Sequence, residues 1–245
     1  MAFTRFHGYY LIWVVVLAEA AVEYSLQHQP SISLTARPSR ISFRKDSEGR
    51  FLPRHEAPLD PQLVGPQAFK HPAVAKWWTW LREEYTPQSS VAIVTPCSNV
   101  KPYTKSPVSR RIRGLLRRLG LWDSKANKPR GIEWLYFSDL LVLVPYEKAE
   151  EYPACCYEVP PEIVLENPKL HSLVTDILAK VMFNLTARGL REVVVFLPRK
   201  HMRLWDEARR KSSRWPKEIL VGYHIFEVRK RLEPVLYRFL GVDTP

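Results

Sequence analysis

Hydrophobic residues along the chain occur in two patterns: short continuous runs, and recurrence at helical spacing. Short continuous apolar runs, typical of buried strands, occupy residues 91–95 and 192–197. Apolar residues at helical spacing predict helices over 71–85, 106–119, 168–189 and 225–240, and a polar helix over 201–214. Residues 132–144 are expected to hold a strand and a turn, and 219–223 a short strand. Strands separated by such helices predict an α/β fold, a layered sheet with mainly parallel strands flanked by helices.

The N-terminal part of the chain shows neither helical spacing nor continuous apolar runs over any long stretch. The apolar run at 9–18 is about half of the roughly 20 residues needed to span a bilayer, and its β-branched residues favour a buried strand over a signal peptide. Residues 27–70 contain many prolines and little periodicity. We therefore expect an N-terminal strand and an irregular, extended Pro-rich arm over 1–70, and an α/β core with basic C-terminal helices over 71–245.

The positive charge of the chain is concentrated in one segment. The formal net charge is +12, and residues 91–130 hold ten basic residues against one acidic residue, Asp123. Such a concentration favours a polyanionic partner, RNA before DNA, over a membrane. A hydrophobic content of 46% excludes a wholly disordered chain. Three cysteines cannot form a closed disulfide framework, which indicates a reducing, cytoplasmic environment.

The segment 106–119 has two different faces. Its apolar residues fall on one helical face, so its arginines point to the other side. Arginine suits phosphate because its planar guanidinium donates two parallel hydrogen bonds. A solvated face is the alternative interpretation. The predicted RNA-binding residues are Arg110, Arg111, Arg113, Arg117, Arg118, Lys125, Lys128 and Arg130, with Arg199, Lys200 and Arg203 in a second patch.

Chemistry-bearing residues follow the strand at 91–95 directly. Cys97 comes first, then Lys101, Tyr103 and Ser106, and a helix begins after them. Carboxyl ends of strands are where α/β proteins place their sites. A cysteine near a lysine and a helix N-terminus suits a nucleophile, whereas the helix end suits an anion. A buried structural cysteine is the third interpretation.

The same string resembles the signature of the archaeosine synthase core domain. That signature is Pro-Cys, three residues, Lys-Pro-Tyr, two residues, Ser, two residues, His. Pro96, Cys97, Lys101, Pro102, Tyr103 and Ser106 match it, as do Val144, Pro145, Tyr152, Pro153, Ala154, Tyr157 and Pro160 in a later block. The resemblance covers roughly residues 71–165.

The resemblance implies a role in tRNA modification. Family enzymes add an amine to the nitrile of a 7-cyano-7-deazaguanine base in archaeal tRNA, and Cys97, Lys101, Tyr103 and Ser106 would line the catalytic pocket. The final His of the signature is replaced by Ser109, however, and serine cannot take over proton transfer near neutral pH. The family's transglycosylase-related and small RNA-binding portions have no room here, so a partner protein is expected to supply them. The alternative is a non-catalytic, ribosome-associated protein that binds rRNA.

Other chemical residues receive plainer interpretations. Cys155 and Cys156 are adjacent without further ligands at metal spacing, so we expect no metal site and no cofactor. His201 is interpreted as a surface histidine. Trp77, Trp78 and Trp80 are expected to be mainly core residues, with base stacking as their role if they are exposed.

Overall fold

The computed structural model describes residues 59–240. The strand expected at 9–18 and most of the expected N-terminal arm lie outside this range. Two short 3-10 helices, Pro61–Leu63 and Pro66–Lys70, come first. The helices that follow are α2 (Pro72–Glu83), α3 (Pro107–Arg118), α4 (Pro161–Leu165), α5 (Pro168–Ala187), α6 (Arg199–Lys211) and α7 (Val228–Tyr237). The strands are β1 (Val91–Pro96), β2 (Trp122–Asp123), β3 (Lys128–Pro129), β4 (Glu133–Ser138), β5 (Val142–Pro145), β6 (Glu192–Val195) and β7 (Lys217–Leu220).

Five of these strands form one sheet in the order β5-β4-β1-β6-β7. Strands β4, β1, β6 and β7 run parallel, and β5 pairs antiparallel with β4. Ile93 at the centre of β1 lies opposite Trp134 on β4 and Val194 on β6. The predicted α/β fold with a mainly parallel sheet is therefore confirmed.

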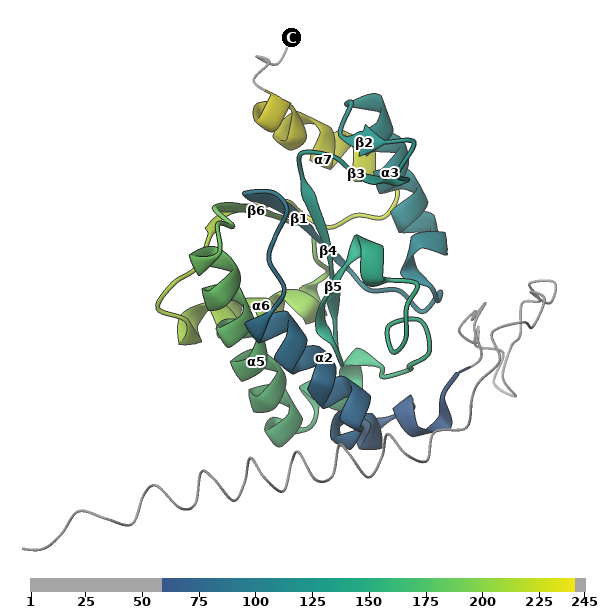
Figure 1. The fold of residues 1–245 in the computed structure, drawn as a ribbon, viewed down its shortest axis with the longest axis vertical. Coiled ribbons are helices and arrows are strands. Elements are labelled where there is room, and N and C mark those ends of the chain that lie inside the picture. The colour runs from purple at the N-terminus through teal and green to yellow at the C-terminus, as the bar shows by residue number, and fades with distance from the viewer. Residues whose placement is uncertain (1–58, 241–245) are drawn as a thin grey trace, which may run out of the picture. The chain divides into compact units, whose positions relative to one another are not determined.

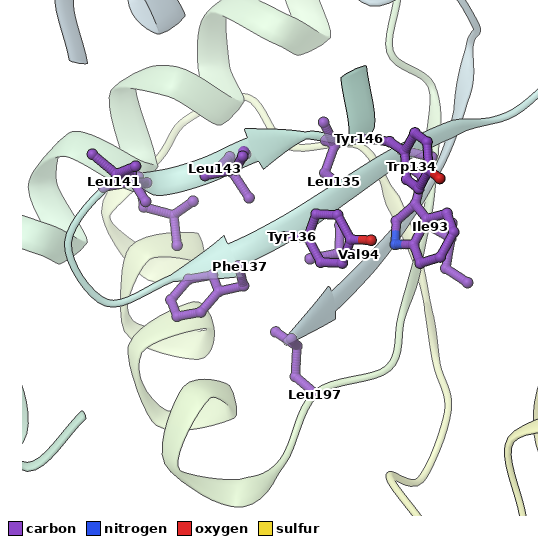
Figure 2. Close-up of a cluster of buried hydrophobic side chains, with 14 of the residues drawn as sticks. Ile93, Val94, Trp134, Leu135, Tyr136, Phe137, Leu141, Leu143, Tyr146 and Leu197 are labelled. Atoms are coloured by element: carbon purple, nitrogen blue, oxygen red, sulfur yellow. The ribbon is translucent and has the colours of Figure 1, made fainter. Parts of the chain in front are cut away.

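The middle of the sheet is apolar on both faces. Strands β1 and β4 are almost entirely buried, as their continuous hydrophobic sequences predict for strands covered on two sides. Figure 2 draws Val94, Tyr136 and Phe137 from these strands and Leu197, which follows β6, as members of one buried cluster. This rigid centre carries the loops in which the candidate site lies.

Helices cover both faces of the sheet. Helices α2, α5 and α6 lie together on one side, and α3 lies against α7 on the other (Figure 1). Local sequence fixes the helix ends: the Ser106 hydroxyl accepts a hydrogen bond from the Ser109 amide at 3.1 Å and caps α3, and Asn167 caps α5. Gly189 takes a positive φ of 110° after α5 ends, which suits glycine.

The chain leaves the two central strands in opposite directions. After β1 it passes through α3 to β4, whereas after β6 it passes through α6 to β7 on the far side. The topology therefore switches direction between β1 and β6, and we call the region at their carboxyl ends the crevice because open α/β sheets bind ligands at such a switch point. Among the described residues, no helix is long and apolar enough to cross a membrane.

Most expected helices and strands appear within a few residues of their predicted positions. The departures are local. The β2–β3 hairpin and α4 were not expected, and the closing helix begins at Val228 rather than at 225. Each missed element is only two to five residues long, too short for hydrophobic periodicity to show.

Candidate functional site

Cys97 is the first residue after the central strand β1. Its backbone amide donates to the carbonyl of Phe137 on β4 at 2.7 Å, so the sheet pairing continues through it. Its Sγ atom lies 3.7 Å from Oδ2 of Asp139. The residue is half-buried.

Asp139 occupies the matching place after β4. The Ser138 hydroxyl accepts hydrogen bonds from the amides of Leu140 and Leu141, at 3.3 and 2.9 Å, and so closes a tight turn around Asp139. Val142 leaves this turn with φ of 69°, a conformation that β-branched residues rarely adopt. The strained turn holds a carboxylate that is almost fully buried.

His201 completes the cluster from the first turn of α6. Its Nε2 atom lies 3.1 Å from Oδ2 of Asp139, and its ring packs 5.1 Å from that of Phe137. Burial disfavours the charged imidazolium, but the Asp139 carboxylate outweighs it and, together with Cys97, raises the pKa of His201 to about 10. The expectation of a surface histidine is wrong: His201 is 6% exposed, because α6 begins over the crevice.

Two buried polar atoms of this cluster have no hydrogen-bond partner among the described residues. They are Oδ1 of Asp139 and Nδ1 of His201. Buried polar atoms in native proteins are nearly always paired. A buried water or a bound molecule at the carboxyl end of the sheet would pair these two atoms.

Lys101 places a buried amino group in the loop that follows Cys97. Its Nζ atom donates to the carbonyl of Ser98 at 2.9 Å and lies 4.3 Å from the ring centre of Tyr157 and 4.8 Å from that of Tyr103. Burial lowers the pKa of Lys101, although the nearby Cys97 sulfur acts in the opposite direction. Lys101 is thus held by aromatic faces and a carbonyl rather than by a carboxylate in direct contact.

Tyr103 belongs to a buried hydroxyl network. Its hydroxyl is hydrogen-bonded to that of Tyr157, which in turn lies 2.6 Å from the Ser138 hydroxyl. The network links the loop after β1 to the turn that holds Asp139. Burial raises the pKa of both tyrosines well above the usual value, so both phenols are neutral donors.

Ser106 lies in the same loop, but its hydroxyl is used within the fold. It caps α3 and lies 2.9 Å from the hydroxyl of Ser109. Ser109, at the signature's His position, also accepts a hydrogen bond from Tyr136 at 3.1 Å and is buried. The structure therefore brings Cys97, Lys101 and Tyr103 together, whereas Ser106 shapes the helix that follows.

Sequence reasoning missed Asp139 entirely and undervalued His201. Both follow strands that pair with β1, and that position is the signal that could have identified them. Together with Cys97 they could also hold a metal ion, because one ligand atom from each lies within 4.8 Å of the others.

The predicted RNA-binding residues fall on two sides of the sheet. Helix α3 holds five arginines and no acidic residue; four are exposed, and Arg113 is half-buried with its guanidinium 3.4 Å from the Tyr146 hydroxyl. Lys125 and Arg130 are exposed and Lys128 is half-buried on or beside the β2–β3 hairpin. Arg199, Lys200 and Arg203 are exposed on α6, across the sheet from α3.

Helix α7 adds cations that the sequence interpretation did not include. It packs against α3 and contains Arg229, Lys230 and Arg231. Arg118 on α3 forms an ion pair with Glu233 on α7, which joins the two helices. The cationic surface on this face is therefore built from two helices.

Known proteins resemble the part of the chain that contains the Cys97–Asp139–His201 cluster. A family model described as a domain of unknown function, DUF5591, matches residues 74–218. Archaeosine synthase subunit alpha of Thermoplasma acidophilum is 25% identical over 130 residues, which is 52% of this chain and 22% of that protein. The chain thus spans well under half of that relative's length.

Among solved structures, the crystal structure of AF0587, a protein of unknown function, superposes with a TM-score of 0.42 and 15% identity, covering 63% of this chain and 48% of that one. The family match includes β1, β4 and β6 and the three residues of the crevice cluster, Cys97, Asp139 and His201. Since the matched residues make up more than half of the sequence, the chain belongs to the DUF5591 family.

Proposed function

We propose that this protein modifies structured RNA, specifically tRNA, by adding an amine to the nitrile of a 7-cyano-7-deazaguanine base. The observation that carries the proposal is the Cys97–Asp139–His201 cluster at the sheet crevice, within the family-matched region. Likeness to archaeosine synthase subunit alpha supports the substrate class. The sequence signature around Cys97 supports the reaction.

The chemistry assigns each residue a separate task. Cys97 reacts as a thiolate: its sulfur attacks the nitrile carbon while the protonated imidazole of His201 donates its proton to the nitrile nitrogen, which gives a thioimidate and a neutral imidazole. An amine then attacks the same carbon, the sulfur leaves with the bonding electrons, and a proton lost by the amine returns to His201. The net result is nitrile plus amine giving an amidine.

Surrounding groups support these steps electrostatically. Asp139 holds the imidazolium of His201 in place at 3.1 Å, and the protonated form of Lys101 would stabilise the sulfur when it carries negative charge. His201 thereby takes the proton-transfer role that the signature assigns to the position of Ser109. An enzyme of this kind needs the base flipped out of the RNA, which the cationic residues of α3 and α7 favour by binding the backbone.

A second candidate function is non-catalytic binding of ribosomal RNA. The observation that favours it is Ser109, which is locked in hydrogen bonds with Ser106 and Tyr136 and cannot act as the missing histidine. In that case the fold and the cationic surface serve association with RNA alone.

The deciding experiment incubates the purified protein with tRNA that contains 7-cyano-7-deazaguanine and with amine donors (ammonium, glutamine and lysine in separate reactions). Nucleoside mass spectrometry then detects the amidine. We expect product with wild type and with the control Cys156→Ala, and none with Cys97→Ala or His201→Gln. Product formation by Cys97→Ala at the wild-type rate would contradict the mechanism.

Binding measurements separate the two candidate functions. Salt-sensitive association with ribosomes, combined with no product from wild type under any amine, would favour the non-catalytic function. Absence of any RNA binding at low salt would overturn both candidates.

A further inference from the structure

The most exposed large hydrophobic side chain of the described residues is Phe226. It is 75% exposed and lies in the loop between β7 and α7. Two of the three stacking candidates from the sequence, Trp77 and Trp78, are buried, and their indole N–H groups donate to the carbonyls of Leu143 and Leu140. The third, Trp80, is half-buried between the rings of Trp77 and Tyr85, so Phe226 offers the more exposed aromatic surface.

Arg111 of α3 lies over the Phe226 ring. Its guanidinium carbon is 5.3 Å from the ring centre, and its Nη1 atom donates to the carbonyl of Ile225 at 2.5 Å. A guanidinium stacked on an aromatic ring offers one apolar face and one cationic edge to the solvent. That pair of features matches a nucleotide, in which a flat base adjoins a phosphate.

The loop that carries Phe226 is fixed at both ends. The amide of Val221 donates to the carbonyl of Val195 at 2.9 Å, and Arg231 of α7 donates to the carbonyl of Gly222 at 3.3 Å. Arg231 also pairs with Glu227 at 2.6 Å. The platform is therefore held in place before any ligand arrives, which lowers the entropic cost of binding.

The same loop reaches the candidate site. The ring of Tyr223 packs 4.9 Å from that of Phe196, directly after β6. Burial raises the pKa of Tyr223. One short loop thus carries both Tyr223, which packs on the residue that follows β6, and the exposed ring of Phe226 three residues later.

We propose that Phe226 and Arg111 form a stacking platform for an unpaired RNA nucleotide next to the base that enters the crevice. This inference rests on the proposed function and describes how RNA is bound next to the candidate site. The surroundings are cationic, with Arg110 nearby on α3 and Lys230 on α7, so an anionic strand is favoured over an apolar protein segment.

The test measures binding of a fluorescently labelled tRNA transcript by anisotropy across a range of salt. We expect Phe226→Ala to weaken binding about 5- to 150-fold, the usual effect of losing one stacked base. Phe226→Trp is expected to bind at least as tightly as wild type, and Phe226→Leu is expected to be weak because it keeps apolar area without a π face. Leu220→Ala, 58% exposed on β7, is the matched control and should bind like wild type.

Salt dependence distinguishes stacking from charge. Phe226→Ala should leave the slope of log affinity against log salt unchanged, whereas Arg110→Gln should reduce it by about one. Wild-type affinity for tRNA in Phe226→Ala would overturn the platform while leaving the proposed function intact. If Phe226→Ala abolishes self-association of the protein but leaves its affinity for RNA unchanged, the surface is a protein contact instead. Failure of the wild type to bind tRNA would contradict the proposed function itself.

Discussion

The Nε2 atom of His201 lies 3.1 Å from the Oδ2 atom of Asp139, although 62 residues separate them along the chain. Both side chains are buried, and Cys97 lies on the same carboxylate oxygen at 3.7 Å. One oxygen of Asp139 therefore orders both the sulfur and the imidazole. A single substitution at any of the three residues changes the environment of the other two.

Stability should depend on the protonation of His201. Its pKa is raised from 6.5 to about 10, so the charged form stabilises the fold fully below pH 6.5, and this contribution is lost as the pH rises towards 10. The variant His201→Gln/Asp139→Asn lacks both charges. As the pH rises from 6.5 to 10, the difference in the free energy of unfolding between wild type and this variant should shrink by up to about 1.4 kcal/mol per unit of pKa shift. Urea unfolding at pH 6, 8 and 10 measures this gap. A gap that stays constant with pH would contradict the ion pair.

Lys101 should trade stability for reactivity. Lys101→Met keeps the aliphatic length but removes a buried ammonium, so we expect the free energy of unfolding to stay equal or rise. The reaction of Cys97 with iodoacetamide should slow at pH 7, because a positive charge near the sulfur is lost. Peptide mass spectrometry measures the labelling of Cys97, and the half-buried Cys156 provides an internal reference. Faster labelling of Cys97 in the variant would show that Lys101 does not assist the sulfur.

Ser106 should act through helix α3 rather than through the reaction. Ser106→Ala removes the hydrogen bond to the Ser109 amide and should lower the free energy of unfolding by about 1 kcal/mol. The rate of amidine formation should fall far less than in Cys97→Ala. Thermal unfolding and single-turnover assays on the same preparations test both statements. A fully inactive but normally stable Ser106→Ala would make the hydroxyl catalytic.

The two basic surfaces should contribute unequally to RNA binding. Helix α3 has no acidic residue, whereas α6 contains Asp206 and Glu207, and Lys211 of α6 pairs with Asp176 and Glu207. Arg110→Gln/Arg117→Gln should reduce the salt slope of tRNA binding by about two. The matched pair Arg203→Gln/Arg210→Gln on α6 should leave it nearly unchanged. Equal effects of the two pairs would mean that RNA contacts both faces.

The sequence allowed much of the sheet to be predicted because its central strands are continuous apolar runs. Ser106 and Asn167 likewise mark helix starts by a local hydrogen bond that depends on nearby residues only. Asp139 carries no such local sign, since its role depends on β4 pairing with β1. His201 sits on a basic helix whose composition suggests a solvent-facing surface, and only the packing of α6 over the crevice reveals its burial.

The order of the sheet also governs when the Cys97–Asp139–His201 cluster forms during folding. Cys97, Asp139 and His201 follow three different strands, and the last of them, β6, comes about 100 residues after β1 in a sheet whose pairings are parallel and therefore non-local. A growing or half-folded chain has the thiol long before it has the carboxylate and the imidazole beside it. The three side chains therefore meet only once β4, β1 and β6 are assembled, so the cluster can serve as a late marker of native pairing across the centre of the sheet.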